Sequence, residues 1–146
     1  MQPKFVVDIN VGRLAKWLRA LGYDAVLLPD ADDGELVRVA LRDRRVILTR
    51  DRRMLERRVV ATGQLRALLI KHEDLKEQLR QVVRSFGLNS QGGFSRCIRC
   101  NQPLAPLPRE SAAARVPPYV YQTQREFMEC PSCHRVYWRG THWPTC

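Results

Sequence analysis

Residues 1–90 alternate four times between a short apolar run and an amphipathic helical pattern, which restricts the possible folds more than any other feature. The first run is rich in β-branched residues, and the four runs predict strands over residues 5–9, 23–28, 45–49 and 65–70. Apolar residues at helical spacing follow each run and predict helices beginning near residues 13, 32, 52 and 72. Such alternation requires a mostly parallel sheet with helices on both faces, so we predict an α/β domain of three layers over residues 1–90.

The composition changes after residue 89. The sequence "NSQGGFS" predicts a linker, and the helical periodicity ends beyond it. Two Cys-x-x-Cys pairs follow, joined by a proline-rich connection, with β-prone pieces before ("YVYQT") and after ("RVYWRG") the second pair. The spacing favours one structural Zn²⁺ site over two unrelated or redox-active pairs, so we predict a small zinc ribbon over residues 91–146. The predicted ligands are Cys97, Cys100, Cys130 and Cys133.

Two further residues, His134 and Cys146, are not among the predicted zinc ligands. His134 follows the last predicted ligand and is an alternative ligand, although we expect it at the surface. Cys146 is left over, and no role is assigned to it.

The charge balance indicates a polyanionic partner. The chain carries 25 Lys and Arg against 15 Asp and Glu, a formal net charge of +10, which favours nucleic acid. No apolar run is long enough for a membrane span and no signal peptide is evident, so we expect a soluble, cytoplasmic protein without a membrane partner. The sequence leaves the oligomeric state open.

Acidic residues stand where the predicted strands end. Asp8 lies at the downstream end of the first strand and Asp51 just beyond the third, and the start of the second helix could add Asp33 or Glu35. If the first and third strands are neighbours, these carboxylates meet at one edge of the sheet and repel one another. Mg²⁺ or Mn²⁺ relieves such repulsion and serves phosphodiester hydrolysis. Taken singly, each acid is also explained as a helix cap.

Arginines crowd residues 38–58 on both sides of Asp51. A charge run alone is usually a solvated face, but cations beside an acidic metal site can hold a phosphate backbone across it. We expect the substrate-binding residues to be Arg13, Arg50, Arg52 and Arg53.

Several stretches together resemble the Mut-seven C-terminal RNase family, in which a PIN-like nuclease domain is fused to a zinc ribbon. They are "VVDINVGRLAKWLRALGYDA", "DDGELVRVA", "VILTRDRRML", the two cysteine pairs and "VYWRGTHW". The resemblance implies a PIN-type sheet and metal-dependent endonuclease activity on RNA, with Asp8 and Asp51 as two of the acids. The helix-start acid of the family aligns best with Asp33, with Asp32 and Glu35 as alternatives. A fourth acid, typical of PIN sites, has no clear counterpart; Glu56 is nearest in sequence, and Glu73 and Asp74 lie farther along.

The resulting hypothesis is a Mg²⁺- or Mn²⁺-dependent endoribonuclease with RNA, or a ribonucleoprotein, as partner. Asp8, Asp33 and Asp51 are its predicted catalytic residues. One alternative is a module that binds RNA or a ribonucleoprotein without cutting it. Another is a phospho-acceptor domain, which is disfavoured because no adjacent acidic pair accompanies Asp8.

Overall fold

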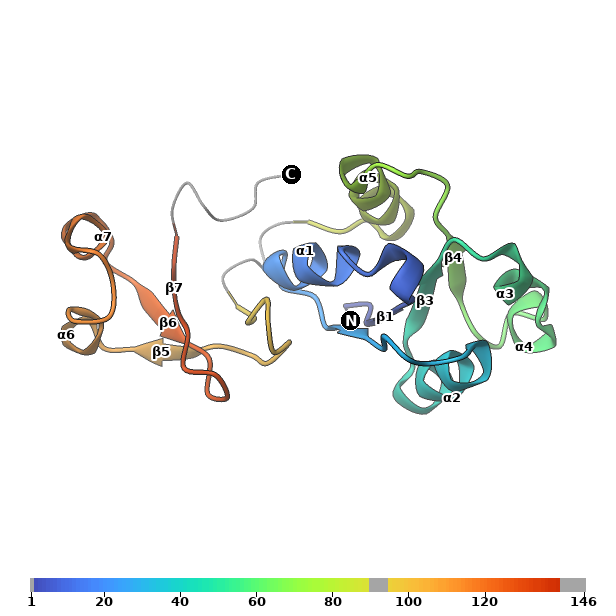
Figure 1. Cartoon of the computed structure of the whole chain (residues 1–146), viewed down its shortest axis with the longest axis horizontal. Helices are drawn as coiled ribbons and strands as arrows, with labels where there is room; N and C mark the ends of the chain where they lie inside the picture. Colours follow the sequence, from blue (N-terminus) through green and yellow to red (C-terminus); the bar gives the residue numbers. More distant parts are fainter. Residues whose placement is uncertain (1, 90–94, 140–146) are drawn as a thin grey trace.

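A computed structural model describes residues 2–89 and 95–139, here called the N-terminal part and the C-terminal part. Each part contains one β-sheet, and the two lie at opposite ends of an elongated molecule (Figure 1). Most of the predicted linker, residues 90–94, lies outside the described residues, so the domain boundary near residue 90 remains a prediction.

The sheet of the N-terminal part is parallel throughout, which confirms the predicted α/β class. Its strands follow the order β2-β1-β3-β4. In register, Val6 of β1 lies opposite Val26 on one side and Ile47 on the other. The strands are β1 (Phe5–Val7), β2 (Ala25–Leu27), β3 (Val46–Thr49) and β4 (Ala67–Leu69).

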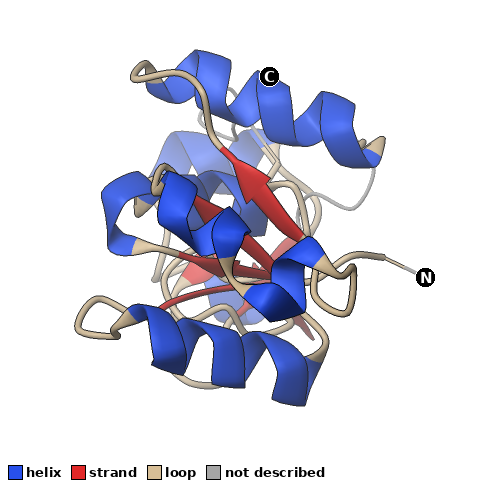
Figure 2. Ribbon diagram, turned by 90° about the vertical axis from the view of Figure 1, so that its right-hand side faces the viewer, coloured by secondary structure: helices blue, strands red, loops and turns tan. Residues whose placement is uncertain are grey.

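Helices cover both faces of this sheet, as the three-layer prediction requires (Figure 2). Phe5, Val7 and Leu48 face a core shared with α1 (Leu14–Ala20) and α5 (Leu75–Phe86). Val6 and Ile47 point the opposite way, because neighbouring side chains alternate along a strand, and contact α2 (Asp33–Asp43) and α3 (Arg52–Glu56). The two central strands, β1 and β3, are therefore buried on both faces.

Several predicted ends are shifted by a few residues, and two elements differ in kind from the sequence prediction. The first strand ends at Val7, and Ile9 begins a 3₁₀ turn, η1 (Ile9–Val11), in which its side chain is 54% exposed. The single helix expected from residue 52 is divided into α3 and α4 (Arg58–Ala61), because Arg57 adopts an extended backbone with ψ 138°.

The C-terminal part contains a three-stranded antiparallel sheet in the order β5-β6-β7. Its strands are β5 (Ala105–Leu107), β6 (Phe127–Glu129) and β7 (Val136–Trp138), and its helices are α6 (Arg109–Ala112) and α7 (Pro118–Thr123). The strand predicted after the second cysteine pair is confirmed. The β-prone interpretation of "YVYQT" is wrong, because Pro118 suits the first turn of a helix and Val120 packs with Phe127. Within the described ranges, no helix combines the length and apolar character needed to cross a bilayer.

Candidate active site and metal centre

The strand order places a ligand-binding edge between β1 and β3. From β1 the chain first builds β2 on one side and then β3 and β4 on the other, so the order reverses at the β1–β3 pair. Open parallel sheets bind ligands at the carboxyl ends of their strands, at this reversal. Asp8 directly follows β1 and Asp51 lies two residues beyond β3, as the sequence pattern anticipates.

Asp8 is a nearly buried carboxylate at this edge, with 8% of its surface exposed. Its backbone N–H donates to the Leu48 carbonyl at 3.0 Å, which fixes the residue against β3. Its side chain accepts a 2.8 Å hydrogen bond from the Thr49 hydroxyl. Asp8 occupies the N-cap position of η1, but its side chain makes no capping bond. The Asp8 carboxylate is thus held in place by Thr49 and is not used to cap η1.

Thr49 also joins Asp8 to Asp51, because its hydroxyl oxygen accepts the Asp51 N–H at 3.0 Å. The Asp51 carboxylate caps α3 by accepting the Arg53 N–H at 2.9 Å and also contacts the Arg53 guanidinium at 3.2 Å. The hydrogen bond from the Arg53 side chain, followed by that from its backbone, lowers the pKa of Asp51. The Asp51 carboxylate is therefore an anion that is already paired with the Arg53 guanidinium.

Asp33 is the first residue of α2, whose N-cap is its neighbour Asp32. The Asp33 charge acts on Arg53, where it adds to the larger effect of Asp51 in raising the guanidinium pKa. Asp33 and Asp51 thus lie near one cation. The three acids are nevertheless not gathered as closely as metal ligands: over residues 2–89 and 95–139, only the four cysteines form a group of three or more potential ligands.

A cavity of about 600 Å³ opens at the same edge of the sheet. Arg13 and Arg50, two of the predicted substrate-binding residues, lie in its wall. Arg50 donates to the His72 carbonyl and lies 4.0 Å from the Glu73 carboxylate, so it bridges the loops after β3 and β4. The residues that line the cavity are Ile9, Asn10, Val11, Gly12, Arg13, Leu27, Arg50, Glu73 and Gln78.

The other arginines of the basic segment differ in surroundings. Arg52 is exposed at the start of α3, and Arg53 is paired with Asp51. Arg45 is not available for phosphate, because its guanidinium contacts Asp24 at 2.7 Å and donates to the Phe5 carbonyl.

Sequence reasoning missed the roles of two polar residues. Thr49 is the first residue of the Thr-x-Asp stretch and the last residue of β3. Its place next to the loop that carries Asp51 is the sequence signal that could have identified its role. Asn10 accepts the Arg50 N–H at 3.2 Å and thereby joins the loops after β1 and β3. Among the three residues considered as a fourth acid, Glu73 lines the cavity, Asp74 caps α5 and Glu56 ends α3.

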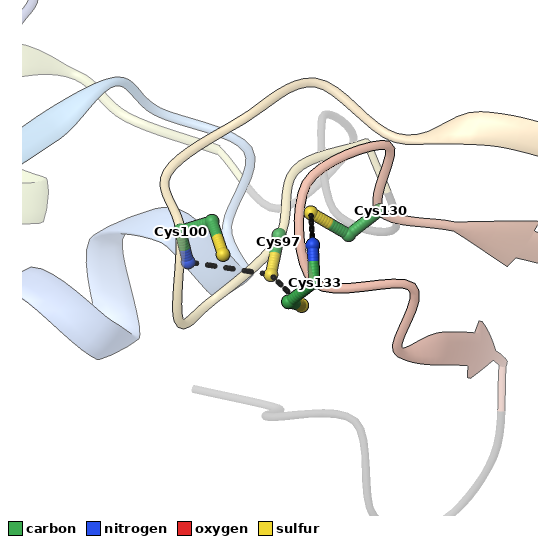
Figure 3. Close-up of side chains that lie close together, drawn as sticks. All are labelled: Cys97, Cys100, Cys130 and Cys133. Carbon is green, nitrogen blue, oxygen red and sulfur yellow. Dashed lines mark hydrogen bonds between the residues drawn. The ribbon is translucent and has the colours of Figure 1, made fainter.

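The four predicted zinc ligands converge in the C-terminal part (Figure 3). Their sulfur atoms all lie within 4.8 Å of one another, and Cys97 and Cys130 are buried. Around Zn²⁺, tetrahedral sulfurs at bond lengths of about 2.3 Å are about 3.8 Å apart. The Sγ atoms of Cys97 and Cys133 are 3.8 Å apart. The cluster can therefore hold a metal ion such as zinc.

The electrostatics of the cluster also suit a cation. Burial would raise the pKa of Cys97, but the Tyr137 hydroxyl and nearby backbone N–H groups hold it at about 7. The Cys133 thiol, followed by burial, raises the pKa of Cys100 to about 12. A thiolate at Cys100 beside that of Cys97 is thus unfavourable without a nearby positive charge, which Zn²⁺ would supply. His134 does not join the group; it is exposed and lies 3.4 Å from Glu129.

Comparison with known proteins agrees with this combination of a parallel sheet and a cysteine cluster. A family model described as the Mut7-C RNAse domain matches residues 3–146. No curated protein and no solved structure matches the chain significantly. The matching description suggests a nuclease-like function with RNA as substrate. Because the match extends over both parts of the molecule, the chain belongs to the Mut7-C RNAse domain family.

Proposed function

We propose that the protein is a divalent-metal-dependent endoribonuclease that hydrolyses RNA phosphodiester bonds at the carboxyl edge of its parallel sheet. The observation that carries this proposal is the state of Asp8. Its carboxylate is nearly buried at the β1–β3 reversal, held by the Thr49 hydroxyl and not used as a helix cap. Family membership independently supports nuclease chemistry.

Asp8, Asp33 and Asp51 would hold Mg²⁺ or Mn²⁺, whose bound form supplies an acidified water and offsets the charge that develops on phosphate. Asp8 would fix the position of that site, because its backbone and side chain are both bonded to β3. Asp51 would join it by exchanging its contact with the exposed Arg53 side chain for the metal. Released Arg53 would then be free to contact a phosphate.

The adjacent cavity would receive the RNA. Arg13 and Arg50 would position the backbone phosphates, and Arg52 and Arg53 would extend this contact along α3. The C-terminal cysteine cluster, loaded with Zn²⁺, would contribute a binding surface for RNA or for a ribonucleoprotein.

The test compares the wild-type protein with Asp8→Asn on end-labelled single-stranded and hairpin RNAs, in Mn²⁺, Mg²⁺ or excess EDTA. We expect metal-dependent cleavage by the wild type and none by Asp8→Asn, with RNA binding and thermal stability nearly unchanged. Asp30→Asn, at an exposed acid of the loop before α2, is the matched control and should cleave normally. Equal cleavage by wild type and Asp8→Asn would remove Asp8 from the mechanism.

A non-catalytic RNA-binding module is the second candidate. It is favoured by the absence, within the described residues, of a cluster of three acids and by the pairing of Asp51 with Arg53. Retention of intact RNA in every metal condition would select this function over the nuclease.

A further inference from the structure

The two cysteine knuckles, residues 97–100 and 130–133, share one backbone design but differ in the residue that follows. Asn101 and His134 both adopt left-handed backbone angles, with φ of 61° and 62°. Each donates its N–H to the carbonyl of the first cysteine of its knuckle at 2.9 Å. Glycine is the usual residue in this conformation, because it lacks a Cβ. The side chain present at each position therefore invites a separate explanation.

Asn101 uses its side chain to cover the outer edge of the parallel sheet. Its Oδ1 accepts the Ala25 N–H at 3.0 Å, and its Nδ2 donates to the Asp24 carboxylate at 2.7 Å. Ala25 belongs to β2, an edge strand whose outward backbone groups would otherwise lack a protein partner. One amide thus satisfies a donor and an acceptor on an element more than 70 residues away in the sequence.

Arg19 of α1 completes the contact from the other side. Its Nε donates to the Ala25 carbonyl at 2.8 Å, and its Nη1 donates to the Ile98 carbonyl at 3.1 Å. Ile98 lies inside the first knuckle, between Cys97 and Cys100, and Figure 3 shows that knuckle beside the pale blue ribbon of the N-terminal part. Both outward groups of Ala25 are therefore bonded to residues of this contact.

The contact continues into the centre of the sheet. Asp24 also accepts from Arg45 at 2.7 Å, and Arg45 donates to the Phe5 carbonyl of β1 at 3.1 Å. A chain of hydrogen bonds therefore runs from the first knuckle through Asp24 to β1. It meets the sheet at the amino ends of the strands, opposite the edge that carries Asp8.

We propose that the first cysteine knuckle is a metal-dependent docking element for edge strand β2, and that Asn101 and Arg19 couple metal loading to the order of that strand. The coupling follows from geometry, because Asn101 and the Ile98 carbonyl are placed by the turn that the two cysteines close. The charges agree with it, since four thiolates around one Zn²⁺ leave two negative charges and Arg19 lies near Cys97 and Cys100.

Hydrogen exchange of the full chain tests the docking. We expect a peptide covering residues 23–28 to exchange slowly in the zinc-loaded protein and faster after zinc is removed by a chelator. Asn101→Gly should exchange fast in this peptide even when loaded, because it keeps the left-handed turn but loses both side-chain bonds. His134→Gly makes the same change in the other knuckle and should behave as the wild type.

Zinc affinity, measured by competition with a chromogenic chelator, tests the role of Arg19. Arg19 holds the Ile98 carbonyl inside the knuckle, and its charge acts on Cys97 and Cys100. Because groups around the ligands orient them and offset their charge, we expect Arg19→Leu to bind Zn²⁺ about tenfold more weakly. Arg99→Leu removes an exposed arginine of the knuckle itself and should leave the affinity unchanged. Asn101→Gly should retain zinc affinity, which separates lost docking from lost metal.

Two results would overturn the proposal. The first is equal exchange of residues 23–28 in loaded wild type and loaded Asn101→Gly. The second is exchange in the wild type that does not respond to zinc removal. Neither readout depends on RNA cleavage, so the proposal can fail or succeed independently of the nuclease assignment.

Discussion

Thr49 shows how much of the candidate site depends on one hydroxyl group. Its side chain is fully buried, donates to Asp8 at 2.8 Å and accepts the Asp51 N–H at 3.0 Å. Thr49→Val preserves the shape but leaves a nearly buried carboxylate without its donor. We expect a loss of about 1–3 kcal/mol in the free energy of unfolding, measured by urea denaturation. RNA cleavage should fall as well, because the position of Asp8 is no longer fixed.

Thr49→Ser is the control for that prediction, since serine keeps the hydroxyl group and loses only a methyl group. Its cleavage rate should lie much closer to that of the wild type than the rate of Thr49→Val does. Equal rates for the valine and serine variants would show that the hydroxyl does not position Asp8.

The positions of Asp8 and Asp51 were predictable from sequence, but their surroundings were not. A residue that follows a buried parallel strand must lie at the carboxyl edge of the sheet, whatever the side chain. Whether Arg53 faces Asp51 or solvent depends on rotamers of an exposed side chain, which no spacing specifies. The sequence pattern also could not show that Arg45 forms an ion pair with Asp24, because that contact depends on the order of the strands in the sheet.

At the scale of single elements, the helix ends follow local rules closely. Gly87 ends α5 in the left-handed conformation, φ 61°, with open space where a Cβ would stand. Gly87→Ala should therefore destabilise the protein through backbone strain alone, by about 1–2 kcal/mol. Gly34→Ala, in the first turn of α2, should instead stabilise it by up to about 1 kcal/mol. The thermal unfolding midpoints of both variants should show that Gly87→Ala lowers stability and Gly34→Ala raises it. Midpoints that shift in the same direction would contradict this expectation.

The same local rules explain which elements were predicted correctly and which were not. Helix caps such as Gly87 and Asp32 depend only on residues close in sequence, so they can be predicted from the sequence. Residues 119–123, "YVYQT", are β-prone by composition, yet they form most of α7. Pro118 starts the helix there, and Val120 is buried against Phe127 of a later strand. Tertiary packing thus overrides intrinsic preference in the part of the chain that has the smallest core.

At the scale of the whole molecule, the contact between the two parts could not be derived from sequence. Its hydrogen bonds join residues 76 to 80 positions apart, and those made by the Asn101 side chain depend on the rare backbone angle of that residue. The cysteine pairs predicted the cluster because four ligands around one metal constrain each other. Nothing comparable linked Asn101 to Asp24 before the fold was known.

Asp24 bonds to Arg45 of its own part and to Asn101 across that contact, and its charge makes stability depend on pH. Burial would raise its pKa, but hydrogen bonds from Arg45 and Asn101, with the charges of Arg45 and Arg96, hold the pKa below its ordinary value. A lowered folded-state pKa contributes stability that is present above the ordinary aspartate pKa of about 3.9 and is lost as the pH falls through the folded value. Asp24→Asn removes this contribution at every pH.

We therefore expect the wild type to exceed Asp24→Asn in unfolding free energy at about pH 7, and the difference to shrink toward about pH 3. Urea denaturation of both proteins at several pH values measures it. Zinc release at low pH is common to both proteins, so the difference between them isolates Asp24. A difference that stays constant across this range would mean that the charge of Asp24, which faces both Arg45 and Asn101, does not contribute to stability. The contact between the two parts would then rest on the neutral bond that Ala25 donates to Asn101 and on the bonds from Arg19 to the Ile98 and Arg99 carbonyls.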